Sequence, residues 1–388
     1  SDTVTFSVSG SELTITSAGV LSFTTAPDYE TKSSYTATVT ATDGTNTTTQ
    51  DITVSVTNLN DNSPAFTSSA SFSAAENQTA IGAVSASDAD GDAVIYSISG
   101  TDAASISINS SSGVITFASA PDYETKTSYA VTATASDGVN SINQSITVNI
   151  SDLNDNSPVF TSVATFSAAE NQTSIGTVTA TDADATDSIT FSVSGTELSI
   201  TSAGVLTFAS APDYETKSSY SATVTVTDGA LSASQSITVT VNNLNDNSPA
   251  FTSSATFSAA ENQTTAGTVA ASDADGNSIT YSISGTDASS MAINSSSGAL
   301  TFNSAPDYET KTSYSVTATA SDGTNSTTQA ITVNVTNVNE APVFTSSATL
   351  SAAENQTTIG TVAASDVEGQ SISYSISGTD ASSMAINS

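Results

Sequence analysis

Hydrophobic and polar residues alternate with a period of two through most of the 388-residue chain. Residues 129–135 (YAVTATA) and 145–150 (SITVNI) show the alternation most clearly. Because successive side chains of a strand point to opposite faces, such segments predict half-buried β-strands. No segment shows the 3.6-residue period of a helix. Shorter β-branched or aromatic runs, which predict further strands, occupy residues 66–72, 81–85, 94–98 and 114–117.

Turn-forming pairs separate these runs, as at Asp90 with Gly91, Ser112 with Gly113 and Asp137 with Gly138. Seven short strands in about 93 residues indicate an antiparallel β-sandwich with Greek-key connections. The predicted fold class is therefore all-β, with seven-stranded, immunoglobulin-like sandwiches in tandem.

The same pattern recurs about every 93 residues along the chain. All eight prolines fall at two positions of this frame, and the second set suits linkers between sandwiches. The two end segments are too short to close a sandwich, so we expect the chain to be a window on a longer array. The predicted units are a partial repeat at 1–62, complete repeats at 63–156, 157–247 and 248–341, and a partial repeat at 342–388.

The charge of the chain is strongly negative, with 38 acidic side chains, 4 basic side chains and a formal net charge of −34. Such a chain repels nucleic acids and anionic membrane surfaces, so we expect neither as a partner. Without an apolar stretch of about 18 residues, we expect no membrane insertion in this segment. Histidine is absent, so no imidazole base is present to activate a serine, and we expect no enzyme activity.

Most of the acids recur at fixed positions of the repeat. The segment Asp-Tyr-Glu-Thr-Lys begins at Asp28, Asp122, Asp213 and Asp307. Ala-Ala-Glu-Asn-Gln, Leu-Asn-Asp-Asn, Asp-x-Asp and Asp-Gly recur in the same order around it. A repeat that keeps carboxylates as well as core residues indicates a charge site rather than a generally acidic surface.

Calcium is the cation that these motifs suit best. Carboxylates, side-chain amides and backbone carbonyls are the hard oxygen ligands that Ca²⁺ prefers, and no cysteine or histidine is present for zinc or copper. Magnesium holds its waters and suits a dense carboxylate cage less well. Taken singly, an Asp-Gly pair is more often a turn, and the acids of Asp-Tyr-Glu could pair with the lysine beside them. Their joint recurrence favours calcium.

These five ordered motifs resemble the cadherin repeat, in its bacterial cadherin-like form, over the whole chain. The resemblance implies cadherin-like sandwiches and up to three Ca²⁺ ions at each junction between repeats. The first junction would use Asp28, Glu30, Asn58, Asn60, Asp61, Asn62, Asp88, Asp90 and Asp137. The second would use Glu76, Asp122, Glu124, Asp152, Asn154, Asp155, Asn156, Asp182, Asp184 and Asp228. The third would use Glu170, Asp213, Glu215, Asn243, Asn245, Asp246, Asn247, Asp273, Asp275 and Asp322. The last would use Glu261, Asp307, Glu309, Asn337, Asn339, Glu340, Asp366 and Glu368.

Two departures from the family pattern change the expected affinity. The first acid of the linker is Asp152 in one copy, whereas the other copies carry Asn58, Asn243 and Asn337. Each asparagine removes one charge, so calcium affinity at those junctions is expected near ~0.1–1 mM. The longer Glu340 and Glu368 are expected to alter ion occupancy at the last junction.

The function that this interpretation predicts is mechanical. Calcium would fix neighbouring sandwiches and form a stiff extracellular rod, the stalk or filament of a bacterial surface adhesin. The cysteine-free, Ser/Thr-rich composition suits that location. One alternative is that the repeats themselves adhere to copies of the same protein or to glycans, in a calcium-dependent way. Another is strand exchange between subunits through the incomplete ends, which we rank lower because the two end segments overlap in the repeat frame.

Overall fold

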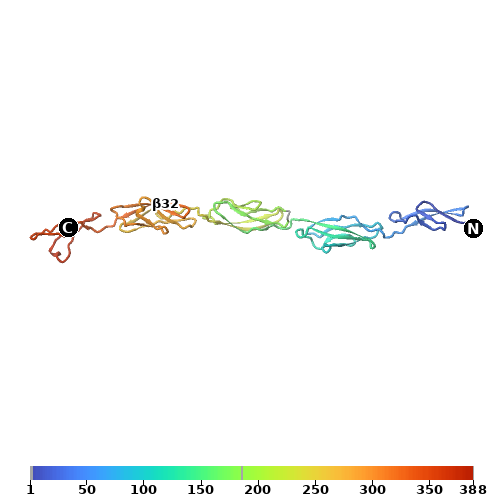
Figure 1. Cartoon of the computed structure of the whole chain (residues 1–388), viewed down its shortest axis with the longest axis horizontal. Helices are drawn as coiled ribbons and strands as arrows, with labels where there is room; N and C mark the ends of the chain where they lie inside the picture. Colours follow the sequence, from blue (N-terminus) through green and yellow to red (C-terminus); the bar gives the residue numbers. More distant parts are fainter. Residues whose placement is uncertain (1–2, 185–186, 388) are drawn as a thin grey trace. The chain divides into compact units, whose positions relative to one another are not determined.

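A computed structural model describes residues 3–184 and 187–387, and within them the chain folds as short β-strands without an α-helix. Figure 1 shows successive groups of strands connected by extended linkers. The described residues contain two short 3₁₀ turns, η1 (Ala288–Ser290) and η2 (Ala381–Ser383). The all-β expectation is therefore confirmed.

The repeat 63–156 contains two facing sheets. A four-stranded sheet has the order β10-β13-β14-β7, and a three-stranded sheet has the order β11-β12-β8. These sheets hold seven strands, the number that the sequence predicted, and a short β6–β9 pair is additional. The bounds are β6 (Ala65–Phe66), β7 (Ser71–Ala75), β8 (Ala80–Ala83), β9 (Ala86–Ser87), β10 (Ile95–Ser99), β11 (Ile106–Ile108), β12 (Val114–Phe117), β13 (Ser128–Ser136) and β14 (Ser141–Ser151).

Three details differ from the sequence expectation. The run at 66–72 is divided between β6 and β7, and β11 lies where the pattern predicted no strand. Strand β7 pairs with β14 in parallel, with Ser71 opposite Thr147, so the sandwich is not wholly antiparallel. This parallel pair brings the end of β7 beside the end of β14, and the linker to the next repeat begins there.

The other two complete repeats have the same sheet orders. In 157–247 they are β16-β23-β22-β19 and β17-β21-β20, and in 248–341 they are β25-β32-β31-β28 and β26-β30-β29. Strand β32 is labelled in Figure 1. The bounds are β15 (Val159–Phe160), β16 (Thr165–Ala169), β17 (Ser174–Thr177), β18 (Ala180–Thr181), β19 (Thr190–Val193), β20 (Leu198–Ile200), β21 (Val205–Phe208), β22 (Ser219–Thr227), β23 (Ser232–Asn242), β24 (Ala250–Phe251), β25 (Thr256–Ala260), β26 (Thr265–Thr268), β27 (Ala271–Ser272), β28 (Thr280–Ser284), β29 (Met291–Ile293), β30 (Ala299–Phe302), β31 (Ser313–Ser321) and β32 (Ser326–Thr336).

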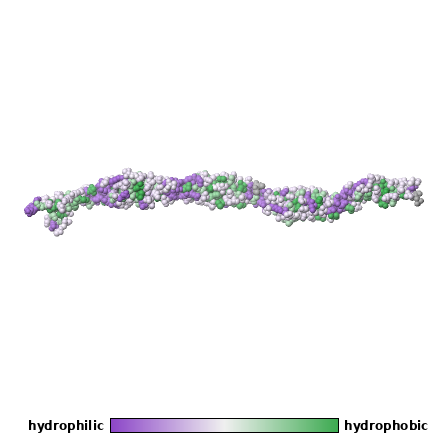
Figure 2. Space-filling view, viewed as in Figure 1, coloured by the Kyte–Doolittle hydropathy of each residue, from purple (hydrophilic) through white to green (hydrophobic). Residues whose placement is uncertain are grey.

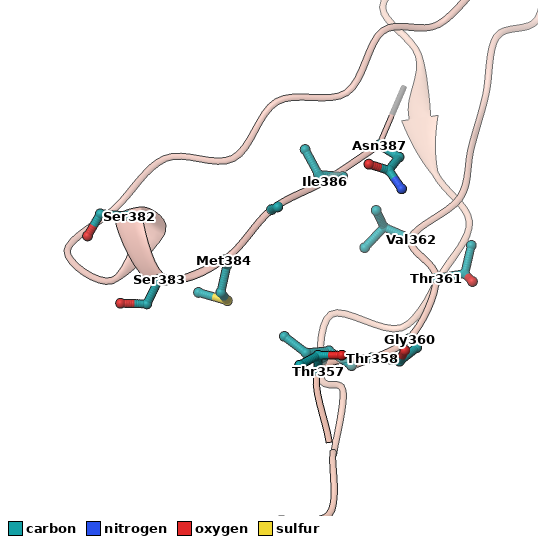
Figure 3. A pocket seen from close by; sticks show the side chains of 12 residues that line it. Thr357, Thr358, Gly360, Thr361, Val362, Ser382, Ser383, Met384, Ile386 and Asn387 are labelled. Carbon is teal, nitrogen blue, oxygen red and sulfur yellow. The ribbon is translucent and has the colours of Figure 1, made fainter. Parts of the chain in front are cut away.

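The two end segments hold parts of the same plan. Residues 3–62 form the sheets β1-β4-β5 and β2-β3, and the segment after 341 pairs β33 with β34. An open cavity in that last segment is lined by residues 357–362 and 382–387, which face each other in Figure 3. In 248–341 the matching strands β26 and β29 both pair with β30. The bounds are β1 (Thr5–Val8), β2 (Leu13–Ile15), β3 (Leu21–Phe23), β4 (Ser34–Thr42), β5 (Thr47–Ser55), β33 (Val343–Phe344) and β34 (Ala364–Ser365).

The inward-facing positions of each strand form the core. Ile146, Val148 and Ile150 of β14 are buried, while the residues between them are exposed. On β13 the inward positions include Ala133 and Ala135, which are fully buried but remove little apolar surface from water. Such a small core explains why contacts outside it matter for stability.

One such contact surrounds the single lysine of each repeat. Lys126 lies 4.5 Å from the centroid of the Tyr129 ring, and this ring meets Phe117 edge-on at 5.0 Å. The ammonium group also pairs with Asp102, from a different loop. The sequence left open whether the lysine pairs with the acids of its own Asp-Tyr-Glu-Thr-Lys segment. In the structure it pairs instead with an acid outside that segment. Lys32, Lys217 and Lys311 pair in the same way with Glu12, Glu197 and Asp287.

We expect Lys126→Met to destabilise repeat 63–156 by about 0.5–1 kcal/mol, because the cation–π contact and a partly exposed ion pair are lost. Hydrogen exchange read by mass spectrometry should show β13 amides exchanging about two- to fivefold faster. The repeat that carries Lys311 serves as an internal control. Unchanged exchange in β13 would mean that the lysine contributes nothing to stability.

Candidate metal centres at the repeat junctions

Predicted ligands gather at four linkers, which we call junction 1 (residues 58–62), junction 2 (152–156), junction 3 (243–247) and junction 4 (337–340). Figure 2 shows hydrophilic residues gathered around the linkers and paler surface over the strands, where Ser, Thr and Ala dominate. The parallel β7–β14 pairing and its two counterparts place an Ala-Ala-Glu segment beside the linkers of junctions 2, 3 and 4.

A buried glutamate ties the linker to the repeat before it at junctions 2, 3 and 4. Glu76 follows β7 and is only 2% exposed. Its Oε2 accepts a hydrogen bond from the backbone N–H of Tyr123 at 2.7 Å, and its Oε1 accepts one from Leu153 at 2.8 Å. Asn77 follows with a left-handed φ of 61°, which asparagine tolerates, and its side-chain amide donates to Asp155. Glu170 and Glu261 make the same pair of backbone contacts at junctions 3 and 4.

The Asp-Tyr-Glu segment forms a turn that positions its glutamate. Asp122 accepts hydrogen bonds from the backbone N–H and the hydroxyl of Thr125, at 3.1 and 3.0 Å. This turn leaves Glu124 beside Glu76 and Asp152, with one oxygen of each within 4.8 Å of the others. Desolvation raises the pKa of Glu124, and repulsion from Glu76, Asp184 and Asp152 adds to the effect.

The last asparagine of the linker contacts the next repeat. The backbone N–H of Asn156 donates to Asp184 Oδ2 at 2.9 Å, and its side-chain amide donates to Oδ1 at 3.0 Å. These bonds to the charged carboxylate hold the pKa of Asp184 below its usual value. Asn62 with Asp90 and Asn247 with Asp275 repeat the arrangement.

Buried carboxylate oxygens without a hydrogen-bond partner mark the inner part of three junctions. The Oδ2 atoms of Asp182 and Asp228 at junction 2 are of this kind, as is Asn154 Oδ1. Asp228 uses its other oxygen to accept from the backbone N–H groups of Ala230 and Leu231, both at 2.7 Å. A buried charged oxygen without a partner is costly unless a cation or water meets it. The equivalent oxygens are Asp88 and Asp137 Oδ2 at junction 1 and Asp273 and Asp322 Oδ2 at junction 3.

The acids that lie within 4.8 Å of one another include members of every junction. The groups are Glu30 with Asp61 and Asp90, Glu76 with Glu124 and Asp152, Glu170 with Glu215, Asp246 and Asp275, and Glu261 with Glu309, Glu340 and Glu368. The ligand atoms in these groups are all oxygens. A cation is needed to offset the negative charges that lie so close together. Calcium therefore fits the residues present.

Junction 4 differs from the others. Ala341 replaces the last asparagine of the linker, and the backbone N–H of Glu340 donates to Glu368 at 3.2 Å. Their carboxyl groups approach each other, and the interaction with Glu368 raises the pKa of Glu340. Both keep a buried Oε2 atom without a partner. The sequence correctly marked these two residues as a departure, while ion occupancy there stays a prediction.

Sequence reasoning missed several residues at the junctions. Asp92 lies in a group with Asp88 and Asp90, and desolvation, with added repulsion from Asp184 and Asp228, raises the pKa of Asp187. Asn140 and Asn325 donate hydrogen bonds to linkers. These residues do not recur in every copy, so a search for recurring acids does not find them. Their nearness to Asp-x-Asp or Asp-Gly was the available signal.

A family model described as the Cadherin domain matches residues 69–151, 163–242 and 255–336, which is more than half of the chain. The chain belongs to the cadherin family. Each matched segment lies inside one predicted repeat, and the outer boundaries of the repeats stay predictions.

Curated relatives share the cadherin sequence over most of this chain. Human cadherin EGF LAG seven-pass G-type receptor 2 is 34% identical over 371 residues, which cover 85% of this chain and 13% of the receptor. Human protocadherin Fat 1 is 30% identical over 407 residues, which cover 93% of this chain and 9% of that protein. The chain thus spans a small part of these relatives. The bacterial qualifier attached to the sequence resemblance is not borne out by them.

Solved cadherin ectodomains share the fold. The protocadherin gammaB4 extracellular domain gives a TM-score of 0.64 at 26% identity, covering 93% of this chain and 67% of that one. The protocadherin gammaB7 EC3-6 structure gives a TM-score of 0.69 at 24% identity, covering 86% and 93%. Among the described residues of this cadherin chain, no helix is long and apolar enough to cross a membrane.

The stability of the metal-free protein should pass through a maximum at mildly acidic pH, between the raised pKa values of the glutamates and the lowered pKa values of the aspartates. The pKa values of Glu124, Glu215 and Glu309 are raised, so these groups bind protons at a higher pH in the folded state than in the unfolded state. The free energy of unfolding should therefore rise as the pH falls from 7. The lowered pKa values of Asp90, Asp184 and Asp275 mean that their contribution is lost at more acidic pH, below about 4.

Melting temperatures measured from pH 4 to 8 in calcium-depleted buffer test this expectation. In excess calcium the melting temperature should instead fall between pH 7 and 5, because protons compete with the metal for the same carboxylates. Glu124→Gln should flatten the rise in metal-free buffer. A metal-free melting temperature that falls steadily from pH 7 to 5 would contradict the assigned repulsion.

Proposed function

We propose that this cadherin segment is an extracellular spacer that calcium stiffens at its junctions. The observation that carries the proposal is the set of buried, unpartnered carboxylate oxygens, as on Asp182 and Asp228, that the fold directs into the junctions. Repeated sandwiches with few distinctive surface residues extend reach without adding specificity. Ser/Thr-rich composition and the extracellular protocadherin gammaB4 domain among the similar structures support an extracellular location.

Each complete junction would hold up to three Ca²⁺ ions. At junction 2, Glu76, Glu124 and Asp152 would form the part nearer the upstream repeat, and Asp182, Asp228 and Asn154 the part nearer the downstream repeat. Bound calcium supplies positive charge that offsets the repulsion among these carboxylates. The chain's own residues supply the remaining rigidity through the Glu76 and Asn156 hydrogen bonds.

Adhesion between copies of the protein is the second candidate, and membership of the cadherin family favours it. Sedimentation of the full chain distinguishes the two candidates: a monomer at every calcium concentration supports the spacer, and calcium-dependent dimers support adhesion. Strand exchange between chain ends ranks lower, because β2 (Leu13–Ile15) and residues 384–386 are copies of the same strand. We also propose that the segment is not an enzyme, since the chain carries no histidine.

Calcium removal should shorten and soften the chain. Without the cations, repulsion at the junctions favours bent arrangements, so the maximum dimension from small-angle X-ray scattering should fall and the melting temperature should drop. Equal maximum dimensions in calcium and in chelator would rule out stiffening by calcium.

A paired variant links this effect to the unpartnered oxygens. In the double variant Asp182→Asn/Asp228→Asn, each new side chain can place its amide NH₂ group where the unpartnered aspartate oxygen lies. An amide NH₂ group cannot bind calcium. We expect the calcium concentration at half-saturation of junction 2 to rise about tenfold. Asp51→Asn is the matched control, because Asp51 on β5 contacts Thr38 and lies outside the candidate sites.

A further inference from the structure

The asparagine that follows each buried glutamate contacts an acid of the linker. At junction 2, the side-chain amide of Asn77 donates a hydrogen bond to Asp155 Oδ2. An ionised carboxylate accepts hydrogen bonds and donates none, so the asparagine supplies the N–H group. The same contact recurs between Asn171 and Asp246 at junction 3 and between Asn262 and Glu340 at junction 4.

Two backbone hydrogen bonds anchor Asn77 to its own repeat. The N–H of Asn77 donates to the carbonyl oxygen of Pro121 at 3.0 Å. The N–H of the preceding Glu76 donates to the carbonyl oxygen of Ser151 at 3.2 Å, at the end of β14. Because both acceptors belong to the repeat, the Asn77 amide reaches the linker from an anchored backbone.

The backbone conformation at this position limits which residues can occupy it. Asn77 has a left-handed φ of 61°, and its copies Asn171, Asn262 and Asn355 have φ values of 61°, 62° and 65°. Glycine, asparagine and aspartate tolerate this region better than other residues. Of these three, only asparagine carries a side-chain N–H group, and aspartate would add a charge that repels the linker acid. Asparagine therefore satisfies both the turn and the contact.

A second amide holds the linker acid from the other side. Asp155 Oδ1 accepts a hydrogen bond from the side-chain amide of Asn156 at 2.8 Å, while Asp155 Oδ2 accepts from Asn77. Amides on the two oxygens fix the plane of the carboxylate and leave its remaining lone pairs for a cation. Junction 3 has the same pair of donors on Asp246, which are Asn171 and Asn247.

The linker acid of junction 4 keeps one oxygen free. Glu340 Oε1 accepts the Asn262 hydrogen bond at 2.5 Å, and Glu340 Oε2 is buried without a hydrogen-bond partner. One oxygen each of Glu340, Glu261, Glu309 and Glu368 lies within 4.8 Å of the others. The asparagine thus holds the acid by one oxygen and leaves the other available among carboxylates that need a cation.

We propose that Asn77, Asn171 and Asn262 are positioning residues, each of which orients the acid of its linker for calcium before the metal binds. This inference rests on the proposed function, since calcium is the ligand for which the acid is oriented. An acid that is already oriented loses less freedom when it binds a metal. Loss of a hydrogen bond that orients a ligand commonly lowers metal affinity about 10- to 100-fold.

Substitution by glycine separates the role of the amide from that of the turn, because glycine adopts a left-handed φ and lacks the side chain. In Asn77→Gly, the half-saturating calcium concentration at junction 2 should rise about tenfold, while that at junction 3 stays unchanged. In chelator, the linker amides of junction 2 should exchange faster than in the unsubstituted chain, because Asp155 has lost a donor. Gln78→Gly is the matched control, since it places the same glycine at the adjacent exposed residue.

Hydrogen exchange read by mass spectrometry, followed through a calcium titration of the full chain, measures each junction separately. Peptides that cover 120–126 and 150–157 report on junction 2. Peptides that cover 211–217 and 241–248 report on junction 3. The calcium concentration at which half of the protection appears gives the half-saturation of that junction.

A double-mutant cycle shows whether Asn77 acts through Asp155. In an Asp155→Asn background, Asn77→Gly should change the half-saturating calcium concentration by less than about twofold, because the carboxylate that Asn77 orients is gone. A merely structural role would give the same loss in both backgrounds. It would also speed the exchange of β14 amides at saturating calcium, and either result would overturn the inference.

The outcomes separate this inference from the proposed function. Protection that depends on calcium at every junction, with the same half-saturation in Asn77→Gly as in the unsubstituted chain, would overturn the positioning role and leave the calcium-stiffened spacer in place. Protection that ignores calcium at every junction would overturn both. Asn171→Gly repeats the test with junctions 2 and 3 exchanged, so the question is decided even if Asn77→Gly fails to fold.

Discussion

Repulsion among carboxylates that share a linker is the constraint on which this structure depends. The fold does not disperse its acids over the surface. It brings Glu76, Glu124 and Asp152 within reach of one another and buries oxygens of Asp182 and Asp228 without partners. Such an arrangement is unfavourable without a counter-cation, and it persists because the surrounding strands and turns fix each carboxylate.

The same residues join the fold to the site. Glu76 accepts hydrogen bonds from the Asp-Tyr-Glu turn and from the linker, so it joins the end of β7, the turn and the linker. The parallel pairing of β7 with β14 makes this geometry possible. With a small core rich in alanine, each repeat depends on such polar contacts and on the Lys126, Tyr129 and Asp102 cluster. Stability and function are therefore linked through the junctions.

Much of this was readable from the sequence, because strand alternation and recurring acids are local signals. Ile146 and Val148 were predicted to lie on one strand face, and the recurrence of Asp-x-Asp marked Asp184. Pairings between distant segments were not readable. The sequence left open whether Lys126 pairs with the acids beside it, and its partner Asp102 comes from a loop 24 residues earlier. Asn140 escaped notice because Leu231 stands at the same position of the next repeat and breaks the recurrence.

The central claim is that the unpartnered oxygens are calcium ligands. Crystals of the chain grown with calcium, measured for anomalous scattering, test it most directly. The account predicts anomalous peaks at junction 2 about 2.3–2.6 Å from Asp182 Oδ2 and Asp228 Oδ2. Ordered density in which these oxygens meet only water, with no anomalous peak at any junction, would contradict it.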